Sequence, residues 1–192
     1  MAVATWVGGD GTGSEQTDYG RAANWSGGVV PDSDDHVIVA NTGHNCKLDT
    51  NRDAASLTIN SSATIDGSGG KLSIKSEGTA SEGTNHFAVK NDGRIVGNLD
   101  LEINTPATTS CDFRGESGHG KFRNVTINHA SCIVNLESTT QFTGALIITL
   151  GKIVCGGNTV EITGATTIGD GSSSADTATL QCDASAMFLG SG

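Results

Sequence analysis

Residues 150–163 read LGKIVCGGNTVEIT, and this stretch decides the fold. Two short apolar segments, KIVC at 152–155 and TVEI at 159–162, lie on either side of a GGN corner, and TVEI alternates polar and apolar residues. Such alternation over four residues is typical of a β-strand with one buried face. A strand this short cannot cover its own apolar face, so we expect another copy of the same plan to stack on it.

The same plan recurs along most of the chain, outward from this stretch in both directions. Segments of alternating apolar residues follow one another from about Leu57, with Gly, Asn, Asp and Ser between them, and no window has a helical period. The interval from Ile103 to Ile127 is similar to the interval from Ile127 to Ile148, but slightly longer. A repeat with a drifting period indicates the turns of a solenoid. We therefore expect one inward column that contains Ile103, Ile127, Ile148 and Ile162.

The composition favours a narrow core. Of 192 residues, 35% are hydrophobic and only 4% are aromatic, and 27 are glycine. A β-sandwich is the alternative, but it needs a thicker core and tight hairpin turns, and the chain has no Asn-Gly pair. The sequence predicts an all-β, right-handed parallel β-helix over residues 51–192, preceded by a cap segment at residues 1–50.

The proposed cap differs from the repeats in its residues. Both tryptophans, the only tyrosine and one of the two prolines lie in residues 1–50. A solenoid needs a cap because its last turn otherwise exposes a strand edge and an open core. Since aromatic residues are frequent at interfaces, we predict that Trp6, Tyr19, Trp25 and Pro31 contact a partner. The alternative is that these residues form the core of the cap.

The five cysteines suggest packing rather than a disulfide framework, because their number is odd and no CxxC pair exists. Cys111, Cys132, Cys155 and Cys182 follow one another at intervals that lengthen slightly along the chain. Those intervals are plausible lengths for one turn, so we expect the four side chains to form an inward column. A metal site or a catalytic thiol is the alternative.

Charge and motifs narrow the function classes. A net charge of −10 argues against a nucleic-acid partner. No apolar run approaches the length of a membrane span, and the first residues lack the pattern of a signal peptide, so we expect synthesis in the cytoplasm without export. No cofactor is expected. No metal is expected either, because metal-ligand spacing is missing among the five histidines, His36, His44, His86, His119 and His129.

The N-terminal segment carries a recognisable set of motifs. W-x-G-G begins at Trp6, N-W-x-x-G-x-x-P runs from Asn24 to Pro31, and D-x-V-x-V runs from Asp35 to Val39. This pattern, running into β-helix-like repeats, resembles the start of β-helix virion proteins from tailed bacteriophages (decoration proteins, fibres and spikes) and of some bacterial adhesins. The resemblance implies a virion protein, commonly a homotrimer, whose partner is the major capsid protein or another virion protein.

Enzymes also occur on parallel β-helices, where a site needs paired carboxylates. The best candidates are Asp32, Asp34 and Asp35, whose alternative is a solvated turn, and Asp100 and Asp112 could meet on neighbouring turns. No complete constellation is visible, so the sequence favours a protein that is not an enzyme. A capsid decoration or cement protein is the first hypothesis. A tail fibre or spike tip that binds a receptor or glycan, and a polysaccharide-degrading enzyme, stay open.

Overall fold

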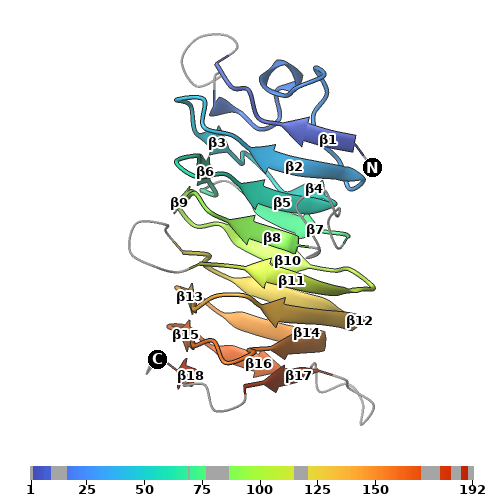
Figure 1. The fold of residues 1–192 in the computed structure, drawn as a ribbon, viewed down its shortest axis with the longest axis vertical. Helices are drawn as coiled ribbons and strands as arrows, with labels where there is room; N and C mark the ends of the chain where they lie inside the picture. The colour runs from blue at the N-terminus through green and yellow to red at the C-terminus, as the bar shows by residue number, and fades with distance from the viewer. Residues whose placement is uncertain are drawn as a thin grey trace.

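The protein is a β-solenoid of about 5 turns, in a computed structural model that describes residues 2–9, 17–68, 70–76, 87–114, 121–169, 178–182 and 187–189. All strand pairs between named strands are parallel within these ranges. The strands stack along one long axis from β1 at one end to β17 and β18 at the other (Figure 1). The predicted all-β parallel β-helix is confirmed.

Each full turn has three faces, which we call A, B and C. Face A contains β1 (Ala2–Thr5), β2 (Asp35–Val39), β5 (Ser56–Ile59), β8 (Phe87–Asn91), β11 (Thr108–Asp112) and β17 (Thr179–Gln181). Face B contains β4 (Arg52–Ala54), β7 (Lys71–Ile74), β10 (Asp100–Ile103) and β16 (Thr166–Ile168). Face C contains β3 (Cys46–Lys47), β6 (Thr64–Asp66) and β9 (Arg94–Val96), and further along β13 (Thr140–Phe142), β15 (Val160–Ile162) and β18 (Met187–Leu189).

Two long strands belong to two faces each. The first parts of β12 (Val125–Leu136) and β14 (Leu146–Val154) lie on face B, and their last residues lie on face A of the next turn. Gly151 forms the bend in β14 with a φ of 95°, where a Cβ atom would lie 2.6 Å from the carbonyl oxygen of His129. Glycine is required here because both the backbone conformation and the close contact exclude a side chain.

The predicted isoleucine column exists with one different member. Ile103, Ile127 and Ile148 are in register on face B and are buried. The next position belongs to Ile168, which pairs with Ile148 and is 49% exposed. The expected Ile162 is buried, but on face C beside Phe142. The predicted position of Ile162 in the column is wrong, because the interval from Ile148 to Ile162 is shorter than the full turn from Ile148 to Ile168.

The predicted cysteine column is only partly right. Cys111 is in register with Leu136 instead of Cys132, which is buried elsewhere in the core. Cys155 and Cys182 do lie on consecutive turns, and they are joined by a disulfide bond. The expectation that the four cysteines pack as free thiols is therefore wrong for this pair, whereas Cys46, Cys111 and Cys132 are free and buried.

The solenoid extends into residues 1–50, where a separate cap segment was expected. β1 pairs with β2, and β2 continues into the repeat by pairing with β5. A smaller cap remains around the 3₁₀ helix η2 (Ala22–Asn24) and covers the end of the core.

Candidate functional site

The four predicted partner-contact residues lie inside the cap. Trp6, Tyr19 and Trp25 are 0%, 0% and 2% exposed, and Pro31 is also buried. The ring of Trp25 makes edge contacts with Trp6 at 5.2 Å and with Tyr19 at 4.7 Å between ring centroids. These side chains therefore form the core of the cap, as the alternative interpretation has it.

Hydrogen bonds fix this aromatic cluster to the solenoid. The indole N–H of Trp25 donates to the carbonyl oxygen of Tyr19 at 2.7 Å, and that of Trp6 donates to the carbonyl oxygen of His44 at 3.1 Å. The guanidinium of Arg52 lies 5.6 Å from the centre of the Tyr19 ring. Burial raises the pKa of the Tyr19 hydroxyl, with a smaller contribution from Cys46, so the phenol stays neutral. A buried, neutral cluster of this kind holds the end of the core closed and offers almost no surface to another chain.

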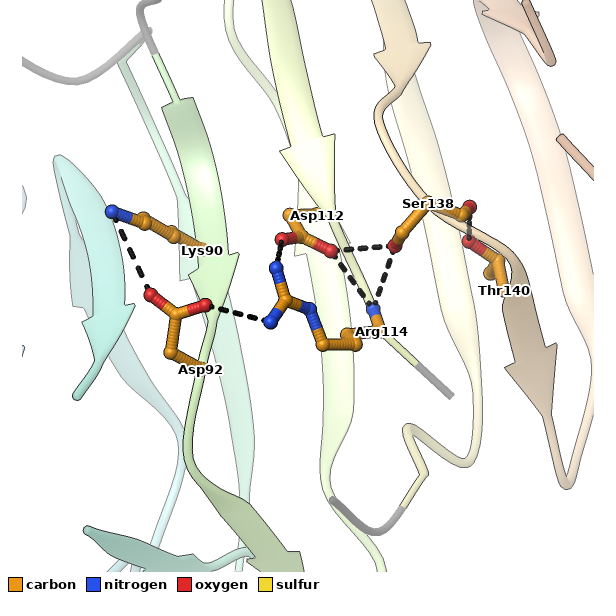
Figure 2. Close-up of polar contacts among 6 residues, drawn as sticks. All are labelled: Lys90, Asp92, Asp112, Arg114, Ser138 and Thr140. Atoms are coloured by element: carbon orange, nitrogen blue, oxygen red, sulfur yellow. Dashed lines mark hydrogen bonds and ion pairs between the residues drawn. The ribbon is translucent and has the colours of Figure 1, made fainter. Parts of the chain in front are cut away.

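The outer surface of the described residues carries a polar network at the corner between faces A and C (Figure 2). Its centre is Asp112 at the end of β11, whose side chain is 7% exposed. One Asp112 oxygen accepts from the Arg114 guanidinium at 2.9 Å, and the other accepts from the Ser138 hydroxyl at 2.5 Å. The backbone N–H of Arg114 donates to Ser138 Oγ at 3.1 Å.

The network continues to the preceding turn. Arg114 Nη1 lies 3.2 Å from Asp92, whose other carboxylate oxygen lies 3.6 Å from Lys90 Nζ. At the opposite end, the Thr140 hydroxyl donates to the carbonyl oxygen of Ser138 at 3.1 Å. As Figure 2 shows, the side chains link three successive turns, and each carboxylate faces a cation. This arrangement suits a cross-link better than general acid or base catalysis, which needs a carboxyl group free to exchange a proton with a substrate.

A second network lies on face B. Asp100 accepts from Arg123 Nε at 2.7 Å and from Asn124 Nδ2 at 3.1 Å, and Glu102 bonds to Lys71 and Asn128. Partial burial is the largest single influence and would raise the pKa of Asp100 and Glu102. The hydrogen bonds and neighbouring positive charges together outweigh it and lower both pKa values, through Arg123 and Asn124 at Asp100 and through Lys71 and Asn128 at Glu102. Both groups are therefore carboxylates at neutral pH. Asp100 and Asp112, considered as a pair from the sequence, bind separate partners on different faces.

The remaining acidic candidates form a turn. The backbone N–H of Asp34 donates to the Asp32 carboxylate at 2.9 Å, and the backbone N–H of Asp32 donates to the Asp35 carboxylate at 3.2 Å. Asp32 and Asp34 are exposed, and Asp35 begins β2. The geometry agrees with a solvated turn whose acids cap its own backbone.

One pair of chemically capable side chains was missed from the sequence. His36 on β2 and Ser56 on β5 are in register, and His36 Nδ1 is hydrogen-bonded to the Ser56 hydroxyl. The signal was that the two residues occupy corresponding positions of two successive turns. His36 is 4% exposed and Ser56 is 0% exposed, so a substrate has no access to the hydroxyl in this conformation. The hydrogen bond between His36 and Ser56 therefore links β2 to β5 inside the solenoid.

The described residues present neither a metal site nor a membrane-spanning helix. No group of three or more His, Cys, Asp or Glu side chains in the described part of the chain could hold a metal ion. His86 and His119 lie outside the described residues. Within the described ranges, no helix has the length and apolar character needed to cross a membrane.

The fold and the surface define a parallel β-solenoid whose turns are linked by side-chain networks. Comparison with models of protein families, with curated proteins and with solved structures found no match to the chain.

Proposed function

We propose that the chain is a non-enzymatic structural component whose solenoid serves as a stiff spacer and contact surface. The observation that carries this proposal is the use of the carboxylates Asp92, Asp100, Glu102 and Asp112 as links between successive turns. Backbone hydrogen bonds between stacked strands and the ion pairs outside them should make the solenoid rigid. A rigid solenoid suits a structural role better than binding and releasing a substrate.

We further propose that the component belongs to a phage virion and is a capsid decoration or cement protein. Support comes from the N-terminal motifs, which lead directly into a parallel solenoid as they do in the family that they resemble. In this proposal the chain is a homotrimer and binds the major capsid protein or another virion protein. Binding would stabilise the assembled shell by mass action, because the decoration protein binds the shell and not its separated subunits.

The test is to count and locate the protein in purified phage particles from the source of the sequence. Quantitative mass spectrometry and labelled-antibody electron microscopy should find many copies, spread over the shell. A few copies at the tail would instead identify a fibre or spike tip. Absence of the protein from particles would overturn the virion proposal in both forms.

The non-enzymatic part has its own test. We expect no depolymerisation when the purified chain is incubated with bacterial capsular and cell-wall polysaccharides. Cleavage that is lost in Asp32→Ala or Asp35→Ala, but kept in Asp49→Ala, would show a carbohydrate-cleaving site at the turn before β2 and contradict the proposal.

A further inference from the structure

The disulfide bond between Cys155 and Cys182 joins two successive turns on face A. Cys155 directly follows β14, Cys182 directly follows β17, and the neighbouring residues Val154 and Gln181 are in register. The two Cα atoms are 4.9 Å apart, within the usual range for a disulfide. The bond therefore fixes the end of β17 to the strand above it.

Within the described residues, burial holds β17 only weakly apart from this bond. Its register with β14 covers only Thr179, Leu180 and Gln181. Thr179 and Gln181 are exposed, and Leu180 is only partly buried against the core. A short strand with one partly buried apolar side chain belongs to the least stable part of a fold. The disulfide bond therefore holds β17 in register with β14, which burial of its side chains does only weakly.

The other three thiols are unsuited to exchange with the pair. Cys46, Cys111 and Cys132 are all 0% exposed. Burial raises the pKa of Cys46 and Cys111 well above the ordinary value and that of Cys132 to about 11. Since the thiolate is the reactive form, these cysteines stay protonated and inert near neutral pH. Cys182, by contrast, is only partly buried, so a small thiol or disulfide can reach it.

We propose that Cys155 and Cys182 form a redox clasp, which docks β17 on the edge of β14 when oxidised and releases it when reduced. A low-molecular-weight disulfide such as oxidised glutathione is the oxidant. The Cys182 thiolate attacks this disulfide and expels one small thiolate, which takes up the proton that Cys182 lost. The Cys155 thiolate then attacks the mixed disulfide and expels the second small thiolate, which likewise takes up a proton. Two protein thiols and one small disulfide become one protein disulfide and two small thiols.

The clasp ties the state of this end of the solenoid to its surroundings. In a reducing cytoplasm the two thiols persist and β17 is free, and in an oxidising medium the bond forms and the turn closes. The redox clasp requires only the fold and the two cysteines, and it does not require that the chain is a virion protein.

Thiol labelling of the full chain tests the clasp. One sample is oxidised with glutathione disulfide and another is reduced with dithiothreitol; each is desalted, treated with N-ethylmaleimide without denaturant, and mapped by peptide mass. We expect no label in the oxidised sample, and label at Cys155 and Cys182 alone in the reduced sample. Label at Cys182 in the oxidised sample would show that the bond does not form. Lack of label at Cys155 after reduction would show that β17 stays docked, and either result overturns the proposal.

Hydrogen exchange supplies a second measurement. Loss of a cross-link that closes a loop of this length corresponds to an increase in opening of about 400-fold. We therefore expect the amide of Gln181, which faces β14, to exchange about 400-fold faster after reduction, while those of β5 keep their rate. Cys182→Ser should exchange fast with or without reductant, whereas Cys46→Ala should keep the difference. Equal rates at Gln181 in the oxidised and reduced chain would contradict release.

Discussion

The two ends of the described stack are held by different means. At the β1 end, Trp6, Tyr19 and Trp25 bury almost their whole side chains, and both indoles hydrogen-bond to backbone carbonyls. At the β17 end, the strand is largely exposed and a covalent bond attaches it. A cap made by packing holds in any redox state, whereas one made by a disulfide depends on the surroundings. The comparison predicts that the ends respond to different perturbations.

The largest effect is expected when the packed end is broken. Trp25→Ala should lower the free energy of unfolding by about 3–5 kcal/mol, because it leaves a cavity between Trp6 and Tyr19. Urea denaturation followed by circular dichroism measures this loss. Trp25→Phe is the matched control, and it should lose less because it keeps an aromatic ring in the same space. An Ala variant that unfolds at the wild-type midpoint would contradict the assignment of the cap core.

Breaking the covalent end should have the next largest effect. For a disulfide that closes a loop over a sequence separation of 27, chain entropy gives about 3.5 kcal/mol. We expect Cys182→Ser to lower thermal stability by an amount of that order in oxidising buffer, with no loss relative to wild type in reducing buffer. Loss of stability in both buffers would mean that the side chain at position 182 acts through packing and not through the bond.

The repeats were predictable because alternation and corner residues are local properties of the sequence. Where the interval between isoleucines equals the turn length, as from Ile103 to Ile127 and on to Ile148, the predicted register is confirmed. The predicted register is wrong where the turn length changes. The turn that begins at Cys111 passes Cys132 and returns to the same position only at Leu136. The disulfide between Cys155 and Cys182 was not predicted for the same reason, because turn lengths that vary hide which cysteines lie side by side.

The networks and the cap core were harder to predict, for two physical reasons. Asp112 and Ser138 lie far apart in the sequence, and their contact depends on the register of two turns together. Aromatic residues at the end of a solenoid can cover the core or face a partner, and both roles call for the same residue types. The sequence left those alternatives open, and burial decides that Trp6, Tyr19 and Trp25 cover the core.

Between the two ends, one core position works against stability. Asn91 on β8 is fully buried, and neither polar atom of its amide has a hydrogen-bond partner among the described residues. Since a buried unsatisfied polar group costs about 1–3 kcal/mol, Asn91→Leu should stabilise the chain by an amount of that order. Urea denaturation checks the sign. Asn124→Leu is the control, and it should destabilise because the Asn124 amide donates to Asp100. A less stable Asn91→Leu variant would show that the amide has a partner.

The smallest effect separates the ion-paired turns from the last turns by pH. The ion pairs described above lie between Lys71 and Arg123, in the middle of the stack. Asp100 and Glu102 have pKa values lowered in the folded state, so their stabilisation is complete above the unfolded pKa near 4 and is lost as the pH falls through the folded values.

Because both carboxylates are partly exposed, each contributes roughly 1 kcal/mol or less. Asp100→Asn should therefore reduce the loss of stability on acidification from pH 6 to pH 3, as measured by thermal unfolding. Asp49→Asn, at an exposed pair with Arg52, should leave the profile close to that of the wild type. Hydrogen exchange at pH 3 should then quicken in β10 before β15, since no ion pair between described residues reaches β15. If β15 opened first, the networks would not account for the acid response, and the turns without these ion pairs would be the weaker part of the solenoid.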